Sequence, residues 1–346
     1  MTPATSRATS RPLAFGNPAP NLDGKVILIT GGTGTFGRAM VSRLLSDFNP
    51  KKVIVFSRDE QKHYQMQQEV KDGRLRFFVG DIRDRDRLMR AFESVDIVLH
   101  AAAMKHVPLA EYNPLEAIRT NIDGAVNLID AALERNVQQV VALSTDKAVA
   151  PVNLYGATKL CMEKLLIAAN SYRGKHPTTF SVVRYGNVVG SKGSVVPLWV
   201  EQAKKGELTL TDPAMTRFWI TLTEAVDLVL LALQAGVGGE VFIPKIPAAD
   251  LATLATAMAE KAHHKVLGTR PGEKLHEALI HADESPQVMD CGRYFVIEPT
   301  FPWWGANPHA GQRVPTGFTF TSANAPERLD VHQLRATLSE LGFPIQ

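Results

Sequence analysis

Two side chains near the middle of the sequence, Tyr155 and Lys159, have the types and spacing needed to take a proton from a hydroxyl group. Residues four apart on a helix share one face, so both would point the same way. The lysine ammonium should lower the phenol pKa from about 10 toward the working pH. Tyr155 then becomes a base for a hydroxyl whose carbon gives up a hydride. Thr145, at the end of a predicted strand, supplies a third member of this site, although YxxxK alone also occurs on ordinary amphipathic helices.

A glycine-rich turn near the start of the chain could bind the cofactor that accepts such a hydride. It separates a predicted strand from a helix, with glycines at three-residue intervals. Glycines there permit a tight turn and let the backbone approach a pyrophosphate, whose charge the helix N-terminus stabilises. The position after a strand favours a dinucleotide site over a plain glycine turn. The predicted contacts in this loop are Gly31, Thr33, Gly34, Thr35, Phe36 and Gly37.

The end of the second predicted strand bears on which dinucleotide binds. An acidic residue at this place would bind the ribose 2′-hydroxyl of NAD. Here the strand ends in Ser57 and Arg58, and a hydroxyl and a guanidinium suit a 2′-phosphate better. We therefore expect NADP. Asp59 leaves NAD as the less favoured alternative, and Arg58 could instead be a solvated charge at the start of a helix.

Two further strand ends should line the same cofactor. Asp81 and Ile82 follow the third strand, and the small residues Ala101, Ala102 and Ala103 follow the fourth. Small residues at these places allow the backbone to approach the adenine and the nicotinamide ribose. Ordinary packing is the alternative for either segment, and their placement at successive strand ends is what favours a role in binding.

The order of apolar runs predicts the fold that positions these residues. Short Val- and Ile-rich runs alternate with amphipathic stretches from residue 25 onward, as in βαβ units of a parallel sheet. The expected strands are 25–29, 52–56, 74–79, 97–100, 139–143 and 179–184, and the expected helices are 36–46, 59–70, 84–93, 114–135 and 153–172. We predict an α/β fold with a doubly wound, Rossmann-type parallel sheet and a smaller α/β substrate-binding domain.

The same pattern divides the chain into parts. Residues 1–22, rich in Ser, Thr, Pro and Ala, are expected to be a flexible tail, and residues 23–188 a dinucleotide-binding domain. A helix over 223–234 and an apolar run over 240–244 indicate that 218–245 return to that domain. Residues 189–217 and 246–346 should then form the substrate-binding domain.

Composition excludes several classes of protein. The 346 residues carry a net charge of +3 without a block of one sign, which fits a phosphate-bearing small ligand and gives no argument for nucleic acid. No apolar run approaches the ~18–20 residues that cross a bilayer. Cys161 and Cys291 lie far apart, and His263-His264, expected at a solvated helix end, lacks acidic or cysteine company, so we predict no metal site. A cytoplasmic enzyme is expected.

The chain resembles the extended short-chain dehydrogenase/reductases from Val26 to about Glu277. Within them it is similar to the short, soluble UDP-N-acetylglucosamine 4,6-dehydratases, and most of all to the C5-inverting type that starts pseudaminic acid synthesis. Longer, membrane-attached relatives commonly have methionine in place of Tyr155. Residues 301–317 depart from the family pattern. The segments that carry the resemblance are AAAMKHVP (101–108), STDKA (144–148), RYGNVVGS (184–191), TRF (216–218) and RPGEK (270–274).

The resemblance implies a reaction in which Asp146 and Lys147 do the second half of the work. Tyr155 removes the C4 hydroxyl proton as hydride leaves, and the new ketone acidifies the C5 proton. A desolvated Lys147 with a lowered pKa would take that proton. Asp146, kept protonated by burial, would donate to the departing C6 hydroxyl. Hydride then returns to C6, the product is a UDP-4-keto-6-deoxy-L-arabino-hexulose, and the tightly bound NADP is regenerated. A surface ion pair is the alternative for Asp146-Lys147.

The family also implies contacts to a UDP-sugar and a homo-oligomer. Arg217 and Arg270 suit a diphosphate through forked hydrogen bonds, and Glu273 suits ribose hydroxyls, although each could be a solvated charge or turn residue. Lys105 is implied for cofactor and substrate alike. The substrate contacts implied are Lys105, Asp146, Lys147, Tyr155, Asn187, Val195, Thr209, Arg217, Arg270 and Glu273.

Two other functions stay open at this point. A nucleotide-sugar 4-epimerase or 4-reductase would use Tyr155 and Lys159 without needing Asp146 and Lys147. An NADP-binding sensor or scaffold would need neither Tyr155 nor Lys159 at the nicotinamide, so the intact pair argues against it.

Overall fold

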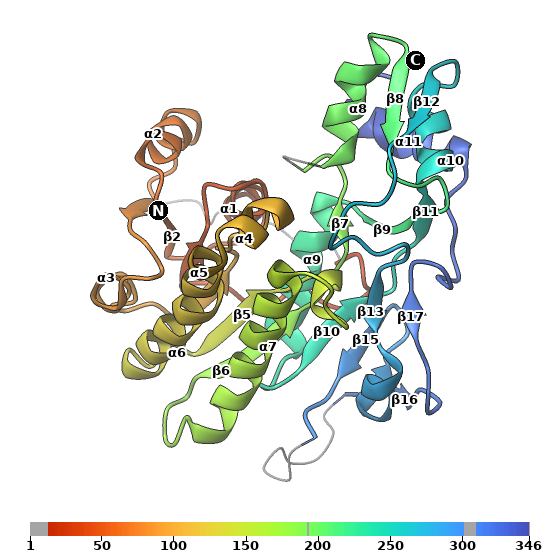
Figure 1. The fold of residues 1–346 in the computed structure, drawn as a ribbon. Coiled ribbons are helices and arrows are strands. Elements are labelled where there is room, and N and C mark those ends of the chain that lie inside the picture. The colour runs from red at the N-terminus through yellow and green to blue at the C-terminus, as the bar shows by residue number, and fades with distance from the viewer. Residues whose placement is uncertain (1–12, 192–193, 301–308, 346) are drawn as a thin grey trace, which may run out of the picture.

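The computed structural model describes residues 13–191, 194–300 and 309–345, which are built around one large sheet (Figure 1). Its parallel strands are β1 (Val26–Thr30), β2 (Lys52–Ser57), β3 (Leu75–Val79), β4 (Ile97–His100), β5 (Gln139–Leu143), β6 (Thr179–Val183) and β10 (Val241–Pro244). Their order is β3-β2-β1-β4-β5-β6-β10, and all neighbours pair in parallel. The order reverses direction between β1 and β4, which confirms the predicted doubly wound sheet.

Helices cover both faces of this sheet. They are α1 (Thr35–Asp47), α2 (Glu60–Glu69), α3 (Arg85–Ala91), α4 (Val107–Tyr112), α5 (Pro114–Ile118), α6 (Gly124–Glu134), α7 (Leu154–Tyr172) and α9 (Leu222–Ala235). Helices α1 and α9 pack together, while α6 packs against both α3 and α7 on the other side (Figure 1). Apart from one interruption, the predicted strands and helices are present, with ends that differ by one or two residues.

The interruption falls in the helix expected over residues 114–135. A π-helical turn, η1 (Arg119–Asp123), separates α5 from α6. Within it Asn121 is buried, accepts a hydrogen bond from Met104 N at 2.8 Å, and donates to Met104 O and Thr158 Oγ1. A π-turn re-aims one side chain out of the helical register. Here it ties the segment after β4 to α7, two elements that border the predicted site.

A smaller lobe stands beside the sheet at the upper right of Figure 1. It contains α8 (Val195–Ala203), β8 (Glu207–Leu210), α10 (Leu251–Met258), β12 (His263–Val266) and α11 (Val331–Glu340). Trp199, Leu254 and Leu334 belong to its own apolar core. The expected helix end at His263 is wrong, because β12 pairs in parallel with β8. A three-stranded sheet of β7 (Asn187–Val188), β9 (Thr216–Ile220) and β11 (Ala248–Asp250) joins this lobe to the rest.

The C-terminal third differs from the expected division of the chain. Strands β14 (Val288–Asp290), β15 (Tyr294–Ile297) and β16 (Gln312–Arg313) fall in the range assigned to the substrate-binding domain, yet they extend the central sheet beyond β10 as antiparallel neighbours. The short strands β13 (Ala278–Ile280) and β17 (Phe320–Thr321) pair with each other. A 3₁₀ turn, η3 (Ala282–Gln287), leads from β13 into β14.

The expected flexible tail is wrong for residues 13–22. Leu13, Phe15 and Leu22 are buried in the main core. The backbone N–H of Ala14 donates to Asp227 Oδ2 on α9 at 3.0 Å. Three apolar side chains in a Pro- and Ala-rich stretch were enough to dock it, which average composition does not reveal. Residues 1–12 lie outside the described residues.

Candidate active site

The glycine-rich turn joins β1 to α1 with the close approaches that a dinucleotide loop requires. Gly31 has a φ of +67°, and a Cβ there would lie 2.9 Å from Ala102 N. A Cβ on Gly37 would lie 2.4 Å from Gly32 Cα, so helix and loop need glycine at both places. Gly34 is the N-cap of α1 and has no side-chain cap, which leaves the first N–H groups of the helix for an anion.

The polar residues at the end of β2 differ in how far they are engaged within the protein. The side chain of Asp59 caps α2 by accepting from Lys62 N, and its carboxylate lies 2.7 Å from Lys62 Nζ. That side-chain contact holds the pKa of Asp59 below its usual range. Arg58 by contrast is 60% exposed and lies 3.8 Å from Asp81 Oδ2. Ser57 Oγ lies 2.9 Å from Thr33 Oγ1, which places it beside the glycine loop.

The end of β4 lies next to β1 and carries the small residues predicted for the nicotinamide side. Thr30 Oγ1 accepts hydrogen bonds from the backbone N–H groups of Ala101 and Ala102, both at 3.2 Å. It also lies 2.8 Å from Nδ1 of the buried His100. These contacts fix the backbone at the point where the sheet order reverses, which is where ligands bind in such folds.

The predicted pair Tyr155 and Lys159 lies in the first two turns of α7. Asn153 caps this helix by accepting from Gly156 N at 2.8 Å. Burial lowers the pKa of Lys159 to about 8 and raises that of Tyr155 to about 12. The expectation of a lowered phenol pKa is therefore wrong for the protein alone. The cost of burying a phenolate exceeds the stabilisation that nearby groups provide.

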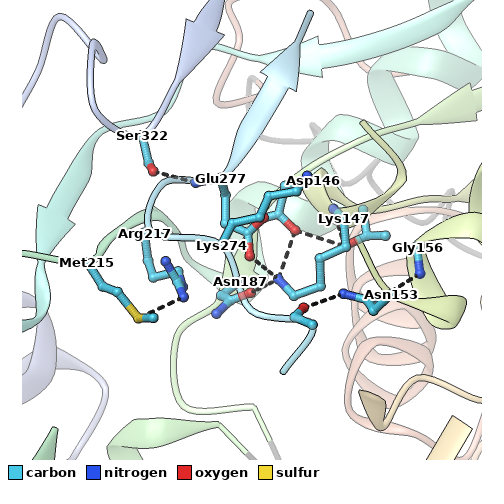
Figure 2. A network of polar contacts seen from close by, with 12 residues as sticks. Asp146, Lys147, Asn153, Gly156, Asn187, Met215, Arg217, Lys274, Glu277 and Ser322 are labelled. Carbon is cyan, nitrogen blue, oxygen red and sulfur yellow. Dashed lines mark hydrogen bonds and ion pairs between the residues drawn. The ribbon is translucent and has the colours of Figure 1, made fainter. Parts of the chain in front are cut away.

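Asp146 and Lys147 lie at the end of β5 in a single 3₁₀ turn, η2 (Asp146–Ala148). Lys147 Nζ lies 3.1 Å from Asp146 Oδ1 and donates to Asn187 Oδ1 at 3.3 Å (Figure 2). Thr145 Oγ1 donates to the same Asp146 oxygen at 2.9 Å. The fifth strand therefore delivers an acid, an amine and a hydroxyl together. Tyr155 lies in the first turn of α7, the helix that packs against η2.

A residue that sequence reasoning missed completes this cluster. Glu277, just before β13, is 3% exposed and lies 3.0 Å from Lys147 Nζ (Figure 2). Its only signal in the sequence is an acidic residue directly before the apolar run of β13. Lys147 thus carries two carboxylate partners, one from each side of the site.

The charges in this cluster agree with one expectation and contradict another. Burial raises the pKa of Asp146, as predicted for an acid. The pKa of Lys147 was expected to fall. Burial does press it downward, but Asp146 and Glu277 outweigh burial and raise it. Lys147 is therefore an ammonium in the protein alone.

Three of the other residues implied for substrate binding, Arg217, Arg270 and Glu273, lie near the Glu277 segment or the start of α7. Arg217, on β9, donates to Leu275 O at 3.2 Å and so borders the Glu277 segment. Arg270 and Glu273 form one turn, in which Arg270 is exposed, Glu273 is half-buried, and the Glu273 side chain accepts a hydrogen bond from Arg270 N at 3.3 Å. Asn153 Nδ2 donates to Gly272 O at 2.8 Å, which brings that turn against the start of α7.

The remaining implied contacts lie elsewhere in the fold. Val195 begins α8, and Thr209 on β8 hydrogen-bonds the side chain of Gln202, so Thr209 is engaged inside the smaller lobe. Lys105 is exposed after β4. For these three residues, contact with the substrate therefore stays a prediction.

A second buried ion network lies behind Lys159. Arg184, which follows β6, donates to both oxygens of Glu163 on α7, at 3.1 and 2.7 Å. It also donates to both oxygens of Glu284 in η3, each at 3.0 Å, and to Leu279 O. All four carboxylate oxygens have a donor, which is the arrangement expected of a structural connection.

Two further features concern metal-ligand groups and membrane-spanning helices among the described residues. Among the described residues no group of three or more His, Cys, Asp or Glu side chains could hold a metal ion. Across the same ranges of the chain, no helix has the length and apolar character needed to cross a membrane.

Comparison with known proteins identifies a family and several relatives. The family described as "Polysaccharide biosynthesis protein" matches residues 27–299. An inverting UDP-N-acetylglucosamine 4,6-dehydratase of Campylobacter jejuni is 49% identical, over 88% of this chain and 94% of its own length. A UDP-glucose 4-epimerase of Rickettsia canadensis is 45% identical, over 79% of this chain and 82% of its own.

Two solved structures are similar as well. Pen from Bacillus thuringiensis is 39% identical, with a TM-score of 0.87 over 93% of this chain and 99% of that chain. The dTDP-glucose 4,6-dehydratase DesIV from Streptomyces venezuelae, whose structure contains NAD and TYD, is 25% identical, with a TM-score of 0.65 over 72% of this chain and 86% of that chain.

Proposed function

Because the chain belongs to this polysaccharide biosynthesis family, within the extended short-chain dehydrogenase/reductases, we propose that it is a C5-inverting UDP-N-acetylglucosamine 4,6-dehydratase. One observation carries the proposal. A second acid–base group, Asp146 with Lys147, lies beside Tyr155, as an elimination needs in addition to a redox step. The inverting relative from Campylobacter jejuni supports the same substrate and stereochemistry.

The residues present fit a nicotinamide dinucleotide. Gly31 and the uncapped first turn of α1 would hold its pyrophosphate, and the backbone after β4 would border its ribose. A bound nicotinamide would supply the hydride transfer that the reaction needs, from C4 of the sugar and back to C6. We propose that Tyr155 accepts the C4 hydroxyl proton and that the ammonium of the buried Lys159, one helical turn away, stabilises the tyrosinate that results.

NADP is our proposed form of the cofactor. Asp59 is engaged as a helix cap, whereas the exposed Arg58 is available for a 2′-phosphate. Replacing Arg58 by Ala should weaken NADP binding about 10- to 100-fold, since hydrogen bonds to charged groups contribute ~1.5–3 kcal/mol. NAD binding should change little. Equal loss for both dinucleotides, measured by titration calorimetry, would contradict this assignment.

Elimination is assigned to the residues at the end of β5. The C4 ketone acidifies the C5 proton, which Lys147 takes as its neutral amine. Asp146, whose pKa burial raises, donates its proton to the departing C6 oxygen. Arg217, Arg270 and Glu273 are proposed to hold the UDP part, because two of them are cations and the third is an acceptor. Arg217 also contacts the segment that follows Arg270 and Glu273, through its hydrogen bond to Leu275 O.

Incubation with UDP-N-acetylglucosamine in heavy water tests the proposal. Mass spectrometry should show loss of one water, and NMR should show a 4-keto-6-deoxy sugar with deuterium at C5 and inverted configuration. Retained configuration would contradict only the stereochemistry. A product of unchanged mass, with the C4 hydroxyl inverted, would instead identify a 4-epimerase, the second candidate that the Rickettsia relative favours.

A further inference from the structure

Glu277 gives the proposed base a second carboxylate that the proposed reaction does not yet use. Lys147 Nζ lies 3.0 Å from Glu277 Oε1 and 3.1 Å from Asp146 Oδ1, so one ammonium serves two acids. Both carboxyl groups are buried. The other oxygen of each, Asp146 Oδ2 and Glu277 Oε2, is buried too and has no hydrogen-bond partner in the part of the chain described.

This composition determines where a proton resides. With both acids ionised the cluster would carry a net negative charge out of water, which is costly. Burial and the charge of Glu277 raise the pKa of Asp146. For Glu277 burial opposes ionisation, but Lys147 and Arg217 outweigh it and lower the pKa. The favoured arrangement is therefore neutral Asp146 beside an ion pair of Lys147 and Glu277.

The position of Glu277 is fixed from a different part of the fold. Its backbone N–H donates to Ser322 Oγ at 2.9 Å, and Ser322 N donates back to Glu277 O at 2.8 Å (Figure 2). Ser322, fully buried, also contacts Thr216 at the start of β9. The charged or titratable neighbours that act on the three-residue cluster are Arg217 from β9, Lys274 from the preceding loop and Tyr155 from α7.

Resting on the dehydratase function proposed above, we propose that Glu277 is a positioning residue for elimination. It is the counter-ion that holds Lys147, and it receives the ammonium proton when Lys147 acts as the C5 base. Asp146 is thereby relieved of pairing with Lys147 and keeps its proton for the leaving hydroxyl.

The proton steps balance without any further reactant. An N–H bond of Lys147 breaks as an O–H bond forms on Glu277, which leaves a neutral amine and a neutral acid. The amine then takes the C5 proton, the C5–H electron pair enters the enolate, and its collapse breaks the C6–O bond as Asp146 protonates that oxygen to water. The cluster and the bound sugar together have no net charge at any step: when the amine takes the C5 proton, the cluster carries one positive charge beside the negative enolate, and protonation of the leaving oxygen by Asp146 makes the cluster neutral again. That balance suits a site this deeply buried.

Glu277→Gln tests the proposal, because the amide keeps the shape but can neither balance the ammonium nor take its proton. With UDP-N-acetylglucosamine and NADP, dehydration should slow at least about 10²-fold, the usual contribution of positioned acid–base groups. Oxidation at C4 should continue, so the absorbance of reduced nicotinamide should accumulate, and KM should change little. Glu277→Asp should recover part of the dehydration rate.

A matched control and two contrary results make the test decisive. Glu298 is also a buried glutamate, and it forms an ion pair with the positively charged Arg313. It follows β15, away from the Lys147 cluster. Glu298→Gln should keep wild-type turnover. Unchanged dehydration in Glu277→Gln, or an equal loss of oxidation and dehydration, would overturn the role of Glu277. If the wild-type protein itself releases no dehydrated sugar, the dehydratase function fails first and this role fails with it.

Discussion

Two buried clusters in this protein are built from the same kinds of residue but differ in how completely their carboxylate oxygens are hydrogen-bonded. Each has one cation between two carboxylates: Arg184 between Glu163 and Glu284, and Lys147 between Asp146 and Glu277. Arg184 fills every carboxylate oxygen around it. The Lys147 cluster leaves one buried oxygen on each acid without a hydrogen-bond partner among the residues that the structure describes.

The difference separates a connection that stabilises the fold from a group that can react. A guanidinium cannot be deprotonated in proteins, and its planar fork saturates two carboxylates at once. An amine can lose its proton, and its partners here keep free acceptor capacity. Unsatisfied buried polar atoms cost stability, so the Lys147 cluster should stabilise the fold less than the Arg184 cluster does.

The largest expected effect is on turnover at the Lys147 cluster. Lys147→Ala should reduce dehydration about 10²- to 10⁴-fold, the range for loss of a general base, while dinucleotide affinity stays close to wild type. Lys147→Arg keeps a cation between both acids but cannot become a neutral amine, so it should be folded and equally slow. Rapid dehydration by either variant, followed by mass spectrometry, would remove Lys147 from the mechanism.

The next effect is on stability at the Arg184 cluster. Arg184→Met leaves two buried glutamates without their cation, which should lower the free energy of unfolding by about 3–5 kcal/mol. Urea denaturation would measure the loss. The fraction that remains folded should still oxidise C4, because Arg184 touches no predicted reacting group. A stability loss below about 1 kcal/mol would show that this network is not a structural connection.

The smallest expected effects are changes in stability when one carboxylate of each cluster is neutralised, and these changes should have opposite signs in the two clusters. The folded-state pKa of Asp146 is raised, so its favourable contribution to stability is present below the unfolded pKa and is lost as pH rises through the folded value. Asp146→Asn should therefore be inactive yet more stable at neutral pH, by about 0.5–2 kcal/mol.

Glu284 should behave in the opposite way. Arg184 outweighs burial and lowers its pKa, so its contribution is present above the unfolded pKa and is lost as pH falls through the folded value. Glu284→Gln should lower stability at neutral pH by about 1.5–3 kcal/mol, with the deficit shrinking in acid. Thermal unfolding at several pH values measures both variants, and a shared sign would remove the distinction between the clusters.

The features that the sequence predicts well are those that depend on the local pattern of residue types. The parallel strands and their helices follow from apolar periodicity, and Tyr155 with Lys159 follow from helical spacing after a strand. Their chemistry was harder, because the pKa values of Tyr155 and Lys147 depend on burial and on neighbours that spacing does not reveal. The π-turn at Asn121 was also missed, since its cause is a contact with Met104 in another segment.

Residues brought together by folding alone could not be found. Glu277 reaches Lys147 from far along the chain, held by a strand pair of only a few residues. Nothing in the neighbouring sequence distinguishes Glu277 from Glu273, which lies four residues earlier and which the family resemblance implies as a substrate contact. The expected domain division failed at β14 to β16 for a similar reason, because short antiparallel edge strands carry little pattern of their own.

The docked segment at residues 13–22 matters for anyone who trims or tags this protein. Burying a side chain such as Leu13, Phe15 or Leu22 contributes roughly 1.5–3 kcal/mol each. Cutting at Asn21 would remove Leu13 and Phe15 and uncover apolar surface beside α9, which invites aggregation during purification. Shortened versions of the protein should therefore keep residues 13–22.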